Sequence, residues 1–179
     1  MNTERRAEIV RILQESSQAF ESAVAGFPAE ACTWTSDPEC WSALQITEHV
    51  AITENGMFRM LQAAVPSETS VENHEREATF ARRVTNRERR APAPQRVHPT
   101  GRFATLAEAL QQFVEARVRT IQFARETELD LFGLAAPHPL FGPVNGYELL
   151  IIMAGHSSRH VAQLEEIRQR LEQGTAPPE

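Results

Sequence analysis

Apolar residues recur at three- and four-residue steps in four long segments of the chain, with charged residues between them. This spacing places the apolar side chains on one face of a helix. It predicts helices over about residues 3–25, 43–65, 106–128 and 146–173. The predicted inward positions are, in chain order, Ile9, Ile12, Leu13, Phe20 and Val24; Ile46, His49, Ile52, Gly56 and Met60; Leu106, Leu110, Phe113, Val114, Val118 and Ile121; and Met153, His156, His160, Leu164, Ile167 and Leu171.

Three of these segments open on a capping box, in which a side chain and the residue three positions later bond each other's free backbone amides. The pairs are Ser42 with Gln45, Thr105 with Glu108 and Asn145 with Glu148. Glycine and proline follow the segments, at Gly26 and Pro28, at Pro66, and at Gly174 with Pro177 and Pro178. Start and stop signals therefore agree with the hydrophobic pattern.

The connections differ greatly in length. Residues 66–104 form a long, charge-rich and proline-rich link, in which a short helix over about 75–84 is expected, whereas the first and last links are short. A long link lets the next helix run parallel to the last. We expect no strands. The chain therefore reads as one all-α domain over 1–179, a four-helix bundle with up-down-down-up topology and a long crossover between the second and third long helices.

Composition narrows the classes of function. The 179 residues carry a formal net charge of −6, which argues against broad binding to nucleic acid or to anionic membranes. The locally basic stretch 76–96 is interpreted as a solvated loop. All 18 basic residues are arginine, so lysine chemistry is excluded. We expect a cytoplasmic protein with Cys32 and Cys40 reduced.

Two histidines four residues apart, His156 and His160, fall on the inward stripe of the last helix, and His49 falls on that of the second. On spacing alone, packed core histidines and a metal site are equally supported. Burying three imidazoles leaves polar nitrogens to satisfy, and a shared divalent cation would satisfy one on each. Glu48 and Glu54 are expected to face solvent.

Other polar residues carry weaker signals. His74, His98 and His138 are expected to be exposed loop residues, although His98 or His138 could reach the mouth of the site. Arg117 lies at the edge of the third helix's apolar face. It could hold an anionic substrate group or orient a carboxylate, which makes it a weak catalytic candidate, or it could simply be a surface arginine.

Several local motifs match one known family: Trp41-Ser42 leading to His49, the run 99–103, the run 138–143, and Gly155-His156-Ser157-Ser158-Arg159-His160 with Gln163. With these, the chain resembles the DinB-like family of damage-inducible proteins over nearly its whole length. The resemblance implies a four-helix bundle holding one divalent ion (nickel, zinc or iron) through His49, His156 and His160. It also implies a small-molecule substrate, since relatives include thiol-dependent S-transferases and isomerases. One related group, sulfur-inserting oxygenases that bind iron through a histidine triad, has a carboxylate two residues after the second histidine of the pair. This chain has Ala162 at that position, which argues against oxygenase chemistry of that kind.

Two hypotheses of function follow. The first is a metal-dependent enzyme, a hydrolase or an S-transferase that uses a low-molecular-weight thiol. The second is a non-catalytic stress-response module that binds metal or a small ligand. A homodimer through an exposed face of the first helix is compatible with either.

Overall fold

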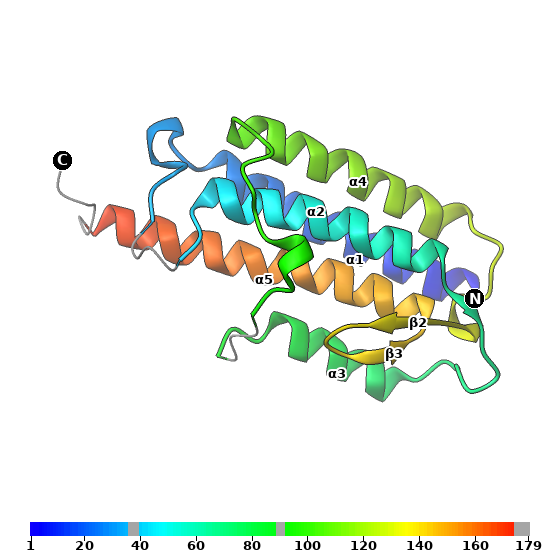
Figure 1. Cartoon of the computed structure of the whole chain (residues 1–179). Coiled ribbons are helices and arrows are strands. Elements are labelled where there is room, and N and C mark those ends of the chain that lie inside the picture. The colour runs from blue at the N-terminus through cyan, green and yellow to red at the C-terminus, as the bar shows by residue number, and fades with distance from the viewer. Residues whose placement is uncertain (36–39, 89–91, 174–179) are drawn as a thin grey trace.

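The computed structural model describes residues 1–35, 40–88 and 92–173, and Figure 1 shows four long helices lying side by side. They are α1 (Thr3–Ala25), α2 (Ala43–Gln62), α4 (Leu106–Glu126) and α5 (Gly146–Glu172). In Figure 1, α1 and α5 run in one direction, and α2 and α4 run in the other. The predicted up-down-down-up bundle is therefore confirmed. The predicted stop at Gly174 lies outside the described residues.

The long connection between α2 and α4 carries the predicted extra helix. This helix, α3 (His74–Thr85), packs against α5 on the outside of the bundle. A short 3-10 turn, η2 (Gln95–Val97), then lies against α2 before α4 begins. Two further 3-10 turns are η1 (Ala29–Ala31), after α1, and η3 (Leu131–Gly133), after α4. The crossover thus lies over the α2 and α5 faces, beside the site.

The expectation that the chain forms no strands is wrong. Three short strands, β1 (Val65–Pro66), β2 (Leu134–His138) and β3 (Gly142–Val144), form an antiparallel sheet in the order β1-β2-β3. They were missed because they are two to five residues long and each contains a proline, which normally demotes a strand in sequence reading. The sheet ties the end of α2 to the link before α5.

All three predicted capping boxes form. In each, the first side chain accepts a hydrogen bond from the backbone amide three residues on, and the Gln or Glu at that position bonds back. The second helix is shorter than predicted and ends at Gln62, since the chain turns into β1 three residues later.

The core consists of two apolar clusters. One lies around Ile9, Leu13, Leu61 and the first half of α5, and the other around Phe20, Ile46, Phe113 and Leu164. Buried polar residues separate the two clusters along each long helix: Ser16 and Ser17 in α1, Glu54 in α2, Arg117 and Thr120 in α4, and Ser157 and His160 in α5. In α2, Glu48 and His49 are also buried, one turn earlier. The bundle therefore has a polar middle layer.

The predicted inward stripes hold for α1 and α5 and need correction elsewhere. Val118, predicted to be inward, is 55% exposed. On α2, the predicted Ile46 and His49 are buried. Further along the helix, the buried positions are Glu54, Met57 and Leu61, whereas the predicted Ile52, Gly56 and Met60 are only partly buried. Because a buried glutamate lies on that face, hydrophobicity alone gave the wrong helical phase for the second half of α2. Among the described residues, no helix has the length and apolarity needed to cross a bilayer.

Candidate metal centre

The structure brings His49, His156 and His160 together in the polar middle layer. The Nε2 atom of His156 lies 3.2 Å from the Nε2 of His49 and 3.2 Å from the Nε2 of His160. His49 comes from α2 and the other two come from successive turns of α5, as the i, i+4 spacing requires. His49 and His160 are 4% and 6% exposed, and His156 is partly exposed. The ligand set predicted from sequence is therefore assembled in space.

In two of these rings, a hydrogen bond at Nδ1 fixes which nitrogen carries the proton. Nδ1 of His49 lies 2.7 Å from the carbonyl oxygen of Val97, and Nδ1 of His160 lies 2.9 Å from Oε1 of Gln163. Since both oxygens only accept, each Nδ1 must donate, and in a neutral imidazole the other nitrogen then carries a lone pair. The lone pairs of both rings thus lie beside His156.

This arrangement fits a divalent metal ion. Two nitrogens 3.2 Å apart, each about 2.0–2.1 Å from a shared zinc ion, would subtend about 100° at that ion. An Nε2–H on His156 could bond only one of its two neighbours, whereas a cation between the rings can accept a lone pair from all three. A metal-ligating histidine usually donates its other N–H to a carbonyl or carboxylate oxygen, as His49 and His160 do here. The donor set and its outer bonds therefore both suit a metal.

Burial keeps the three rings neutral. Desolvation lowers the pKa of His49, and it lowers the pKa values of His156 and His160 well below the ordinary value. Neighbouring histidines lower the pKa values of His156 and His160 further, because two positively charged imidazolium rings so close together would repel each other. Neutral imidazole is the form that binds metal.

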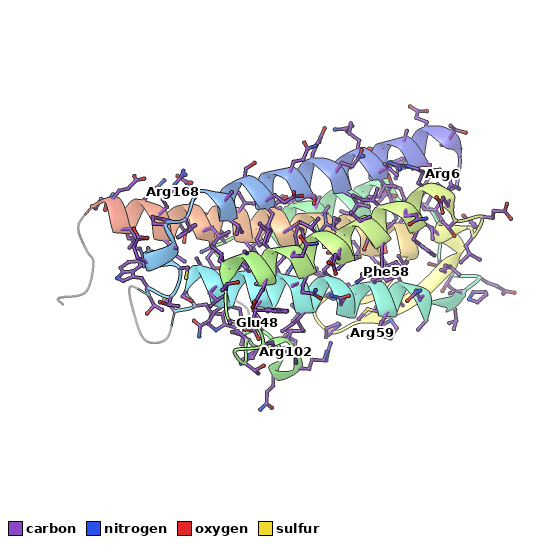
Figure 2. All side chains as sticks on the ribbon, turned by 90° about the horizontal axis from the view of Figure 1, so that it is seen from above. Arg6, Glu48, Phe58, Arg59, Arg102 and Arg168 are labelled. Carbon is purple, nitrogen blue, oxygen red and sulfur yellow. The ribbon has the colours of Figure 1, made fainter. Side chains whose placement is uncertain are left out.

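Glu48, expected to face solvent, is buried, and this expectation is wrong. Its carboxylate accepts hydrogen bonds from three successive backbone amides of the crossover, those of Thr100, Gly101 and Arg102, at 2.7, 3.1 and 3.3 Å. Figure 2 shows Glu48 on α2 beside the crossover residue Arg102. Helical phase could not reveal these partners, since they come from a loop about 50 residues away.

Glu54 is also buried, and its partner is Arg117. The guanidinium is fully buried and bonds both carboxylate oxygens of Glu54, through Nε at 2.8 Å and Nη2 at 2.9 Å. Its remaining N–H groups bond Leu13 and Ser16 of α1 and Met153 and Ser157 of α5. The surface interpretation of Arg117 is wrong. The carboxylate it orients is Glu54, and this cluster joins all four long helices.

The other histidines divide into two kinds. His74 and His98 are exposed, as predicted, but His74 is the first residue of α3 and not a loop residue. His98 packs edge-on at 5.7 Å against Trp41, whose ring also lies 4.8 Å from His49. His138 is buried in β2, so its assignment to an exposed loop is wrong. Desolvation lowers the pKa of His138 to about 4. Cys32 and Cys40 are both free thiols.

A second group of potential ligand atoms, from Glu72, His74 and Glu77, lies between α1 and α3. Nε2 of His74 lies 3.6 Å from the carboxylate of Glu72, and Nδ1 lies 3.7 Å from that of Glu77. The guanidinium of Arg5 already pairs with both glutamates. This group is therefore an ion-pair network rather than a second metal centre.

The fold and the site together define a four-helix bundle with a candidate three-histidine metal site between α2 and α5. The family model of the DinB superfamily matches residues 12–164, and the chain belongs to this superfamily. No curated protein sequence matches significantly.

A solved structure with the same fold is YfiT from Bacillus subtilis, described as a probable metal-dependent hydrolase with an unusual four-helix bundle topology. The TM-score is 0.65 and the identity is 16%, over 96% of this chain and 90% of that one. At this identity the likeness shows the fold.

Proposed function

We propose that this protein is a metal-dependent enzyme that acts on a small molecule, with hydrolysis as its reaction. The observation that carries the proposal is the convergence of three Nε2 atoms, two of them held as lone-pair donors by bonds on the opposite ring nitrogen. The description of YfiT as a probable metal-dependent hydrolase supports the same chemistry.

His49, His156 and His160 would hold the ion, and three nitrogen donors are compatible with zinc, nickel or iron. With a position left open, such an ion supplies Lewis acidity that activates water or a thiol near neutral pH. The chain contributes the neutral state of the three ligands and their orientation.

A thiol-dependent S-transferase would use the same ligands. The sulfur would then come from a low-molecular-weight thiol. A non-catalytic stress-response module is the remaining alternative. It would retain metal for stability and show no turnover.

The test begins with the untagged protein purified at neutral pH. Mass spectrometry should find about one equivalent of a divalent metal per chain, and His160→Ala should lose it. The zinc-, nickel- and iron-reconstituted protein is then assayed against ester, amide and electrophile panels, with and without thiols. Turnover without thiol supports a hydrolase, and turnover only with thiol supports an S-transferase. Metal binding without turnover supports the module, and failure to bind any of the three metals would overturn the proposal.

A further inference from the structure

Two neighbouring residues of α2 grip the same short segment of the crossover. The His49 ring bonds the carbonyl oxygen of Val97, and the Glu48 carboxylate bonds the amides of Thr100, Gly101 and Arg102. The loop 97–102 is therefore held at both of its ends by adjacent side chains of one helix. Its conformation at Gly101 has a φ of 76°, which only glycine adopts without strain.

The Glu48 carboxylate is 1% exposed and faces three peptide N–H groups. A carboxylate that accepts several backbone amide bonds in a buried place holds them more strongly than a neutral acceptor does. If this grip were lost, the amides would turn to water and the loop would leave α2. The Val97 carbonyl would then leave His49, and the ring would be free to rotate or to change tautomer.

We infer that Glu48 is a positioning residue of the metal centre: by fixing the loop 97–102 it fixes the Val97 carbonyl, which holds His49 in its metal-binding tautomer and orientation. The inference rests on the proposed function, because it concerns the affinity of the same three-histidine site. It predicts that metal affinity depends on a carboxylate and a glycine that do not touch the metal.

The first test measures the zinc affinity of the full-length protein by competition with a chromophoric chelator. Glu48→Gln keeps the size of the side chain but places an NH₂ group against backbone N–H donors. Loss of a partner that orients a metal ligand typically weakens binding, so the zinc Kd should rise about 10–100-fold. Urea unfolding of the metal-free variant shows how much of the effect is general destabilisation.

Glu48→Gln also removes a negative charge near the ion, so a second pair of variants keeps the charge constant. Gly101→Ala strains the loop, and Gly142→Ala is its matched control. Gly142 has nearly the same φ, 72°, is the first residue of β3, and like Gly101 has open space around an added Cβ. In the metal-free protein the strained loop 97–102 can leave α2, and metal binding must bring it back.

Gly101→Ala should therefore raise the zinc Kd by about three- to tenfold. Gly142→Ala should leave the zinc Kd within about twofold, although it should lower the free energy of unfolding by about as much as Gly101→Ala does. Unchanged zinc affinity in Glu48→Gln and Gly101→Ala would overturn the inference and leave the metal centre standing, as would equal weakening by Gly101→Ala and Gly142→Ala. Failure of the wild-type protein to bind zinc, nickel or iron would overturn the proposed function, and this inference with it.

Discussion

At the scale of single residues, the Arg117 guanidinium joins the four long helices beside the three-histidine cluster. Arg117→Met would leave the Glu54 carboxylate buried without its partner. Breaking a buried ion pair on one side costs about 3–5 kcal/mol, and urea unfolding of the metal-free protein would measure this loss.

The control for this prediction is Arg119→Met, two residues along the same helix. Arg119 is exposed and bonds Asn55, so its loss should change stability by less than about 0.5 kcal/mol. The double variant Arg117→Met with Glu54→Leu should recover most of the loss, because apolar replacements of a buried pair are tolerated. A double variant as unstable as Arg117→Met would contradict this account.

Residue identity and spacing were enough to predict that the three histidines lie together inside the bundle, because i, i+4 geometry and the inward stripe are local properties of a helix. They were not enough for Glu48, Glu54 and Arg117. A buried charged residue looks the same in sequence as a solvated one, and it is made tolerable by a partner from another helix or from the crossover. Gln163 had a local signal, since it stands three residues after His160 on the same helix.

At the scale of elements, the contact between α3 and α5 depends on Gly155. A Cβ added there would lie 2.1 Å from Cγ1 of Val84, whose branched side chain cannot easily turn away. Gly155→Ala should therefore push α3 from α5 and destabilise the protein by about 1–3 kcal/mol, measured by urea unfolding.

Gly56, in α2, gives the matched comparison, since nothing lies within 4 Å of an added Cβ. Gly56→Ala should stabilise the protein by about 0.5–1 kcal/mol, because alanine is the better helix former. Adding Val84→Ala to Gly155→Ala should restore part of the lost stability. If Gly155→Ala were as stable as the wild type, the close approach would not be a constraint on this interface.

The long helices were predictable because their capping residues and hydrophobic periods agree, and each signal is local. The three strands were not, since a strand of two to five residues containing proline depends on its neighbour for hydrogen bonds. β1 and β2 are about 70 residues apart in sequence, and no local pattern links them. The crossover was predictable from its length, but the bonds that its residues 97–102 make with His49 and Glu48 were not.

At the scale of the whole molecule, four histidines with lowered pKa values link stability to pH. Burial lowers the pKa of His138 to about 4, and it also lowers those of His49, His156 and His160. In the unfolded chain these rings titrate near pH 6.5. Below that pH the unfolded state binds more protons than the folded state, so the stability of the metal-free protein is full above pH 6.5 and falls as pH drops.

For His138 the loss should run from about pH 6.5 down to about pH 4, the folded value. Its Nδ1 accepts the Leu140 backbone N–H, a bond that His138→Asn can keep without titrating. His138→Asn should therefore lose less stability than the wild type between pH 7 and pH 4.5, measured by urea unfolding at each pH in a chelator. Parallel curves for the wild type and His138→Asn would show that His138 does not carry this dependence.

Saturating zinc should raise the free energy of unfolding by an amount that grows with [Zn]/Kd, about 2.7 kcal/mol at 100 times Kd. This gain should shrink in acid, because protons compete with zinc for the three histidines.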